Sequence, residues 1–247
     1  MGKNGVSKRL AKIESTLKKD KPEVKTLDIL LNPLTGGPNG GTQGVYAGGI
    51  LSGAALVNYD LTRGFIQGLE NEGGNIDGNY CKLTSMDMRI LLQNPSAVAN
   101  LAGANPTPYT NQVRLMIIRL PNASPLTPAE VQTQVLEYGV PATYGALCNV
   151  SPLKRNSTIN GGYDVMYDKT HIANANEGQA KSSKMIHFRK KWSKGLTLRF
   201  SGVAGALALE QNRILLFAMD ATNVYDPAAA TPRVNISFIN RLRYSDE

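Results

Sequence analysis

The residue types that most often carry enzymatic chemistry are scarce in this sequence. The two histidines, His171 and His187, lie in no HExxH motif, no cluster of metal ligands and no Ser/His/Asp arrangement. Asp164 and Asp168 are four residues apart on a predicted strand, which puts them on one face about 13 Å apart, too far to act as an acid pair. The sequence therefore predicts a protein that is not an enzyme and uses no metal or cofactor.

Glycine and cysteine residues offer no binding motif either. Eight glycines fall between residues 35 and 53, but without the GxxxxGK[ST] order of a phosphate-binding loop, so a long surface loop is predicted. Cys81 and Cys148 lie in apolar stretches without CxxC spacing. We expect two buried thiols and folding in a reducing compartment.

What the sequence does offer is positive charge: 27 Lys and Arg against 19 Asp and Glu give a net charge of +8. Residues 1–25 carry eight basic and three acidic residues, and residues 154–199 carry ten basic and three acidic residues. Basic side chains near the single Trp192 suit contact with phosphates and occasional base stacking, independent of base sequence. The candidate nucleic-acid-binding residues are Lys3, Lys8, Arg9, Lys12, Lys18, Lys19, Lys154, Arg155, Arg189, Lys190, Lys191 and Lys194.

A solvated surface is the alternative for both basic regions. Surface charge keeps a protein soluble without binding anything, and Trp192 can be a core residue. Chain ends are commonly mobile. In the N-terminal region Leu10, Ile13 and Leu17 fall at helical spacing, so a short amphipathic helix could form when this region meets a partner.

Alternating apolar and polar residues predict the strands that position these charges. The expected strands cover residues 26–31, 56–66, 80–93, 112–120, 163–168, 184–192, 196–200 (after a turn at 193–195), 212–220 and 233–244. One short helix is expected to begin at the capping box Thr127-Pro128-Ala129-Glu130 and to end by Gly139. The strand at 112–120 is apolar on both faces, hence central, and is predicted to pair with the strand at 80–93.

Two strands near the second basic region have predicted faces. Tyr163, Val165 and Tyr167 are expected on one face of the first strand, opposite Asp164, Met166 and Asp168. On the second strand Ile186, Phe188 and Trp192 are expected opposite His187, Arg189 and Lys191. Alternation therefore predicts that Arg189 and Lys191 share a face that Lys190 does not.

Many short strands, one short helix and long loops indicate an all-β sandwich or closed double sheet. The expected organisation is a basic N-terminal arm, residues 1–25, followed by one β domain, residues 26–247. The sequence starts without an apolar run that could serve as a signal peptide, and no stretch approaches about 18 uninterrupted apolar residues. We therefore expect a protein that is neither secreted by the usual route nor membrane-spanning.

Several motifs resemble a known family in their order along the chain. YDVMYDK at 163–169 is similar to an aromatic-x-V-L-Y-D-K strand, and a lysine-bearing loop and a basic strand at 184–191 follow it. GNYCKLTSMDMRI at 78–90, QVRLMIIRLP at 112–121, NRILLFAMD at 212–220 and RVNISFINRLRYSDE at 233–247 complete the order. Over roughly residues 56–247 the chain resembles the single jelly-roll capsid proteins of small icosahedral viruses. The resemblance is strongest to those of circular single-stranded DNA viruses and of related plant satellite and tombus-like viruses.

The resemblance implies an eight-stranded antiparallel jelly-roll sandwich that self-assembles into an icosahedral shell. Its partners would be copies of itself, about 60 in the simplest shell, and a viral genome, single-stranded DNA or RNA, with no membrane. The protein would reside in the virion, after synthesis in the host cytoplasm and with assembly there or in the nucleus. Two features depart from the family: the arm is rich in lysine and interrupted by acids, and Leu120-Pro121 replaces an aspartate after the V-R strand.

Two other functions remain open from the sequence. A non-viral β-sandwich module could bind acidic glycans or other polyanions through the same basic surface. A hydrolytic or sugar-processing enzyme on a jelly roll is the third alternative, but it lacks a visible metal or acid-base set. Binding of glycans by a monomer would favour the module, and activity abolished by altering one carboxylate would favour the enzyme.

Overall fold

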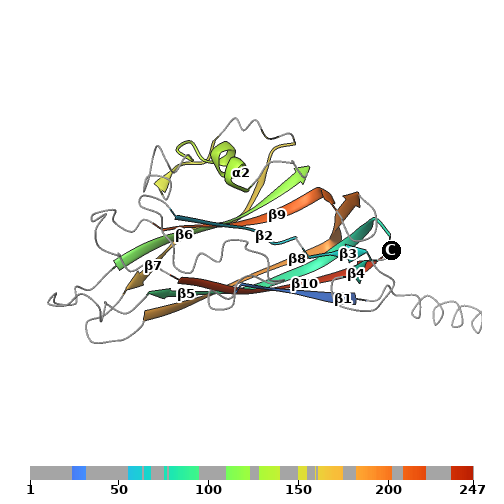
Figure 1. Ribbon diagram of the computed structural model, residues 1–247, viewed down its shortest axis with the longest axis horizontal. Coiled ribbons are helices and arrows are strands. Elements are labelled where there is room, and N and C mark those ends of the chain that lie inside the picture. The colour runs from blue at the N-terminus through green and yellow to red at the C-terminus, as the bar shows by residue number, and fades with distance from the viewer. Residues whose placement is uncertain are drawn as a thin grey trace, which may run out of the picture.

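A computed structural model of the chain describes residues 24–31, 55–62, 64–67, 75–76, 78–94, 110–122, 128–139, 150–154, 159, 161–174, 182–201, 208–220 and 235–246. The strands form two layers that pack face to face, and a helix lies on the outside of one of them (Figure 1). The lower layer in Figure 1 holds β1 (Val24–Leu31), β10 (Asn235–Asp246), β5 (Tyr80–Asn94) and β8 (Ser182–Ser201), in that order. The upper layer holds β2 (Ala55–Asp60), β9 (Ala208–Asp220), β6 (Thr110–Asn122) and β7 (Asp164–Asn174).

All pairings within the two layers are antiparallel. Strands that are neighbours in one layer are mostly distant in sequence, because the chain changes layer at every connection between these eight strands except the one from β6 to β7. The layers are hydrogen-bonded to each other at one corner, where residues 199–201 of β8 pair with residues 208–211 of β9. This strand order confirms the all-β fold of an eight-stranded antiparallel jelly-roll sandwich.

The main core fills the space between the layers. Strand alternation sends Met86, Met88, Ile90 and Leu92 of β5 inward, and all four are fully buried. The inward side chains of β10, β8, β6 and β9 meet them. Two very short strands, β3 (Ile66–Gln67) and β4 (Asn75–Ile76), lie beside this core, to which Ile76 of β4 and Phe65, the residue before β3, belong.

A second, smaller core lies on the outer side of the β2-β9-β6-β7 layer, beneath helix α2 (Pro128–Val135). Its members from the sheet are Met116, Ile118, Leu120, Leu215, Phe217 and Met219, and those from the helical side include Val131, Val135 and Leu136. The layer is thus buried on both faces. That burial explains why β6 and β9 are apolar on both faces, and it agrees with the prediction of a central strand at 112–120.

The predicted pairing between the strands at 80–93 and 112–120 is wrong. These residues form β5 and β6, which are interior strands of different layers: β5 pairs with β10 and β8, whereas β6 pairs with β7 and β9. Strands adjacent in sequence are adjacent in most sheets, but the jelly roll alternates layers at this connection. Periodicity identified both strands, and it carries no information about their partners.

The predicted faces of β7 are also wrong at its start, because of a β-bulge. Ile117 pairs with Tyr167 and Ile118 pairs with Val165, so Met166 is an extra residue. Met166 and Tyr167 both pack against the main core, whereas Tyr163 packs against the second core under α2. The bulge therefore also places Asp164 and Asp168 on opposite faces of the sheet.

The predicted turn at 193–195 is a wide irregularity inside one continuous strand, β8. Leu83 of β5 pairs with Leu196 and Ser85 pairs with Lys191, so four residues of β8 bulge opposite one residue of β5. Gly195 lies in this bulge with φ of 73°, a conformation that residues with a Cβ rarely adopt. The other predicted strands agree with the structure within a few residues, with two exceptions: the strand predicted at 56–66 ends at Asp60, and the one predicted at 163–168 continues to Asn174.

Candidate nucleic-acid interface

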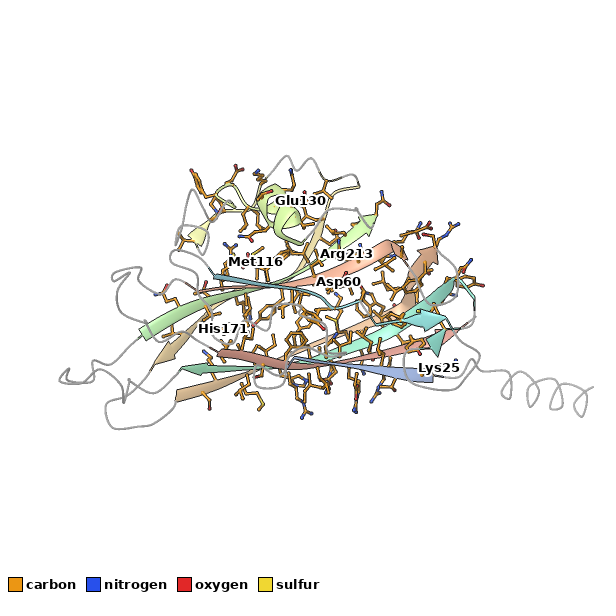
Figure 2. The ribbon with its side chains drawn as sticks, in the orientation of Figure 1. Lys25, Asp60, Met116, Glu130, His171 and Arg213 are labelled. Carbon is orange, nitrogen blue, oxygen red and sulfur yellow. The ribbon has the colours of Figure 1, made fainter. Side chains whose placement is uncertain are left out.

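The outer side of the β1-β10-β5-β8 layer gathers charged side chains from all four of its strands. Because β5, β8 and β10 send every second side chain into the core, the intervening residues point outward. Figure 2 shows their nitrogen-tipped side chains below the lower layer. We call this surface the charged face and define it by Asp28, Asp87, Arg89, His187, Arg189, Lys191, Arg241 and Arg243.

One row of the charged face alternates acid and base across all four strands. The register aligns Asp28 of β1 with Arg241 of β10, then Asp87 of β5, then Arg189 of β8. Arg241 donates to Asp28 from Nε at 2.8 Å and from Nη2 at 2.7 Å. Arg189 donates from Nε to Oδ2 of Asp87 at 2.9 Å, and Nε2 of His187 lies 2.7 Å from Oδ1 of the same carboxylate.

The two neighbouring rows hold bases without acids. On one side Arg243 aligns with Ser85 and Lys191, and on the other Arg89 aligns with His187. The face thus has five Arg and Lys residues against two Asp residues. Its charge is positive, and the surplus lies in the rows that flank the ion-paired row.

Both aspartates of the charged face have pKa values below the ordinary value of the residue. The hydrogen bond from Arg241 holds the pKa of Asp28 below its ordinary value. Burial raises the pKa of Asp87, but the hydrogen bonds from His187 and Arg189 outweigh burial and leave that pKa below its ordinary value. Ion pairs as exposed as these contribute little to stability. A contribution to folding stability therefore does not account for the charged residues on this face.

The charged face contains two of the twelve predicted binding residues, Arg189 and Lys191. The prediction that these two share a face is confirmed by their pairing with the outward Asp87 and Ser85. Lys190 pairs with the buried Met86, so it lies on the inward side of β8, and its side chain is exposed at the rim of the sandwich. Lys194 is exposed in the bulge of β8.

Lys154 lies on the opposite side of the molecule, with helix α2. Its Nζ donates to the carbonyl oxygen of Thr133 at 2.7 Å, which satisfies a backbone acceptor in the last turn of the helix. The structure therefore does not bring Lys154 together with the charged face. The other predicted residues, Lys3, Lys8, Arg9, Lys12, Lys18, Lys19 and Arg155, lie outside the described residues.

Three arginines of the charged face were not among the predicted binding residues: Arg89, Arg241 and Arg243. Each of them alternates along its strand with buried apolar residues, so the signal was present in the alternation. What the sequence lacked was the strand order β10-β5-β8, which aligns these arginines with Arg189 and Lys191. The surface arises from the pairing of strands that are distant in sequence, and the alternation within a single strand does not reveal it.

One end of the same outer side is apolar. Leu30 of β1, Ile239 of β10 and Met185 of β8 point outward and are exposed. Leu30 pairs with Ile239, which in turn pairs with Arg89. The outer side thus changes from basic at the Arg243–Lys191 row to apolar near Met185.

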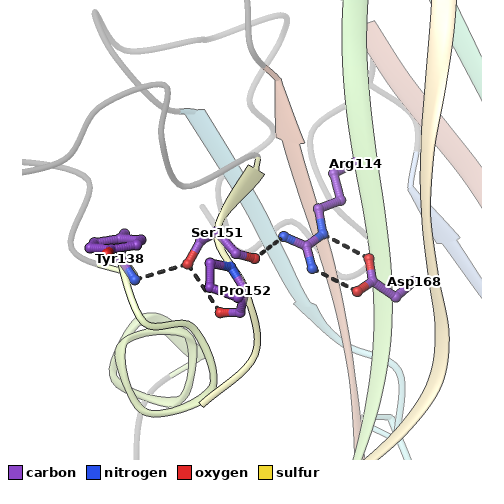
Figure 3. A network of polar contacts seen from close by, with 5 residues as sticks. All are labelled: Arg114, Tyr138, Ser151, Pro152 and Asp168. Carbon is purple, nitrogen blue, oxygen red and sulfur yellow. Dashed lines mark hydrogen bonds and ion pairs between the residues drawn. The ribbon is translucent and has the colours of Figure 1, made fainter.

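A buried ion pair ties the helical segment to the other layer. Arg114 of β6 is 8% exposed and donates to Asp168 of β7 from Nε at 2.7 Å and from Nη2 at 2.6 Å. Its Nη1 donates to the carbonyl oxygen of Ser151 at 2.6 Å, and the Ser151 hydroxyl accepts from the backbone amide of Tyr138 at 2.8 Å (Figure 3). This network fixes the α2 segment on the sheet. Asp164 instead accepts from Nε of Arg119 at 2.8 Å, on the opposite face.

Potential metal ligands and thiols form no cluster among the described residues. In the ranges that the structure describes, no group of three or more His, Cys, Asp or Glu residues could hold a metal ion. Cys81 is buried in the main core and forms no disulfide with another described residue, as predicted, whereas Cys148 lies outside those ranges. The described part of the chain also contains no helix of the length and apolarity needed to cross a membrane.

Comparison with solved structures finds a chain of desmodium yellow mottle tymovirus. The match has a TM-score of 0.33 and 12% sequence identity, and it covers 92% of this chain and 89% of that chain. A likeness this weak carries no argument about function. No protein-family model matches the sequence, and no curated protein matches it.

Proposed function

We propose that the chain is a viral coat protein that self-assembles into a closed icosahedral shell and packages nucleic acid against its charged face. The observation that carries this proposal is the charged face itself. It is a broad sheet surface that gathers Arg89, Arg189, Lys191, Arg241 and Arg243 from three strands. Phosphate oxygens are the natural partners of such a surface, because Lys and Arg bind them without reading base sequence.

The start of β1 connects the charged face to the basic N-terminal residues. Val24, the first residue of β1, pairs with Ser245, two residues from Arg243. The chain therefore enters the sheet at the basic end of the charged face, not at its apolar end. Residues 1–23 carry seven Lys and Arg and three acids, so a segment of net positive charge is joined to the sheet at that end.

The form of the face favours a flexible polyanion over a folded acidic partner. Four strands about 4.8 Å apart make a surface some 14 Å wide between its outer strand axes. Its ion-paired row is flanked on both sides by rows of bases, so charge is spread over the surface and not concentrated in one pocket. A single-stranded DNA or RNA genome fits this distribution, and assembly of about 60 copies would repeat it over the inside of the simplest shell. The protein would then reside in the virion.

The test is to express the chain alone and to examine the product by electron microscopy after nuclease treatment. We expect closed particles whose ultraviolet absorbance ratio shows protected nucleic acid. Persistent monomers at high protein concentration and low salt would contradict self-assembly. Monomers that bind acidic glycans and purify without nucleic acid would instead support a polyanion-binding module.

A further inference from the structure

A second group of basic residues lies at the open side of the sandwich, between the free edges of β7 and β8. These strands end their respective layers there, and inward-facing positions on both strands change from apolar to basic. Tyr167, Lys169 and His171 of β7 pair with Ile117, Leu115 and Val113, all of which face the main core. Figure 2 shows His171 between the two layers.

Strand β8 supplies the other side of this group. Phe188 contacts Tyr167 edge to face, with ring centroids 5.6 Å apart. The positive charge of Lys184, four residues before Phe188, acts on His171, four residues after Tyr167. The two strands therefore run in opposite directions here, and Lys184 lies near His171 on an inward position, opposite the buried Leu92.

The contacts within this group are specific. Nε2 of His171 lies 2.9 Å from the Tyr167 hydroxyl, and the two rings are stacked with centroids 6.1 Å apart. Nζ of Lys169 lies 5.8 Å from the centroid of the Tyr167 ring. Lys169 and Lys184 thus approach the histidine from different strands.

No acid balances these charges among the described residues that face the group. Over this stretch β5 and β6 contribute apolar inward side chains, and the two aspartates of β7 pair with arginines elsewhere. The connection 175–181, with Glu177 and Lys181, lies outside the described residues. Burial lowers the pKa of His171, and the charges of Lys184 and Lys169 lower it further.

We propose that Tyr167, Lys169, His171 and Lys184 form a binding site for a phosphate group, supplied by a nucleic-acid backbone or by a free polyphosphate. The nucleic-acid source rests on the proposed packaging function, whereas the free-phosphate source does not. Two ammonium groups and an imidazole N–H can donate to phosphate oxygens, and the tyrosine hydroxyl supplies a fourth donor. The site is separate from the charged face, which points away from the core.

Binding at this site takes up a proton. A bound phosphate offsets the charges of Lys169 and Lys184, so it raises the pKa of His171 toward or above its ordinary value. By linkage, a ligand that raises this pKa binds more tightly as the pH falls through the range between the free and bound pKa values. Phosphate binding is therefore coupled to mild acidification.

The test follows the His171 ring proton by NMR during pH titrations of the full chain, alone, with pyrophosphate, and with a short oligothymidylate. His187 serves as the second histidine signal. We expect at least one ligand to raise the His171 pKa. Movement with pyrophosphate identifies a general phosphate site, and movement with the oligonucleotide only identifies a backbone site. An unchanged His171 pKa with both ligands at saturating concentration would overturn the proposal.

Matched lysine variants separate this site from general electrostatics. Lys169→Ala and Lys184→Ala should each weaken binding of the ligand that moves His171 by about tenfold, the loss expected for one charge-assisted hydrogen bond. Lys25→Ala, in β1 at the other end of the sandwich from His171 (Figure 2), should leave that affinity unchanged. Equal losses in all three variants would overturn the site. These measurements need no particles, so their failure is distinct from failure of self-assembly.

Discussion

The two outer sides of the sandwich differ more than any other pair of regions in the described structure. The outer side of the β2-β9-β6-β7 layer is apolar and covered by helix α2. The outer side of the β1-β10-β5-β8 layer is charged, and the described chain leaves it open. Both layers contribute to the same main core, so the fold does not require the difference.

The contrast separates what stabilises this protein from what it presents to a partner. On the covered side a charged residue appears in a closed network: Arg114 is buried and bonded to Asp168 and Ser151. On the open side the arginines are exposed, and the two rows that flank the ion-paired row contain basic residues but no acids. A buried, paired charge has a structural role, whereas exposed basic residues that outnumber the nearby acids remain available for binding.

Loss of the buried arginine should have the largest effect on stability. Arg114→Ala leaves Asp168 and the Ser151 carbonyl without their donor, so we expect a loss of about 4 kcal/mol in the free energy of unfolding. Urea unfolding measures it. Arg119→Ala is the matched control, because Arg119 pairs with Asp164 on the same two strands but in an exposed setting, and it should cost about 1 kcal/mol or less. Equal losses would contradict the buried role of Arg114.

Truncation of an apolar side chain should have the second largest effect on stability, and this effect should differ between the two outer sides. Leu136 is 1% exposed beneath the helical segment, so Leu136→Ala should destabilise the protein by about 3 kcal/mol. Leu30 is 49% exposed on the open side, and Leu30→Ala should change stability by no more than about 0.5 kcal/mol. A large loss at Leu30 would show that the open side is covered in the folded protein. Denaturation midpoints of the two variants decide this.

The structure also shows which features were predictable from sequence. The apolar alternation of β5 and β10 defined their buried faces, because one residue in two must enter the core. The capping box defined the start of α2, because its signal is local. The bulge at Met166 carried no such signal, and its one extra residue reversed the faces of Tyr163 and Asp164 relative to Tyr167 and Asp168. Residues 193–195 did carry a local signal, which predicted a turn, but the pattern could not show that the chain continues there as one strand with a bulge. Strand order depends on contacts between distant segments, and for that reason Arg89, Arg241 and Arg243 were missed.

Removal of positive charge from the open side should weaken nucleic-acid binding more than folding. Arg89→Gln combined with Arg243→Gln removes two bases from the flanking rows and breaks no described ion pair. The slope of log affinity for oligothymidylate against log salt should fall by about 1.4, at about 0.7 for each phosphate contact with a single strand. Lys154→Gln, on the covered side, is the control and should leave the slope unchanged. An unchanged slope in the double variant would show that the charged face does not bind the oligonucleotide.

Acid should produce the smallest effect, and it should arise on the open side. The pKa values of Asp28 and Asp87 are lowered in the folded protein. Their contribution to stability is therefore complete above the unfolded pKa of about 4 and is lost as pH falls through the lower folded values. Asp28→Asn with Asp87→Asn should reduce the loss of stability between pH 5 and pH 2. An unchanged loss would show that acid sensitivity arises elsewhere.

The central claim is that nucleic acid inside a closed shell contacts the charged face. Ultraviolet crosslinking of nuclease-treated particles, followed by mass mapping of the crosslinked peptides, tests it directly. We predict crosslinks in peptides that contain Arg89, Arg189 with Lys191, or Arg241 with Arg243, and none in residues 128–139 of the covered side. Crosslinks confined to residues 128–139, with the charged face unmodified, would contradict the claim.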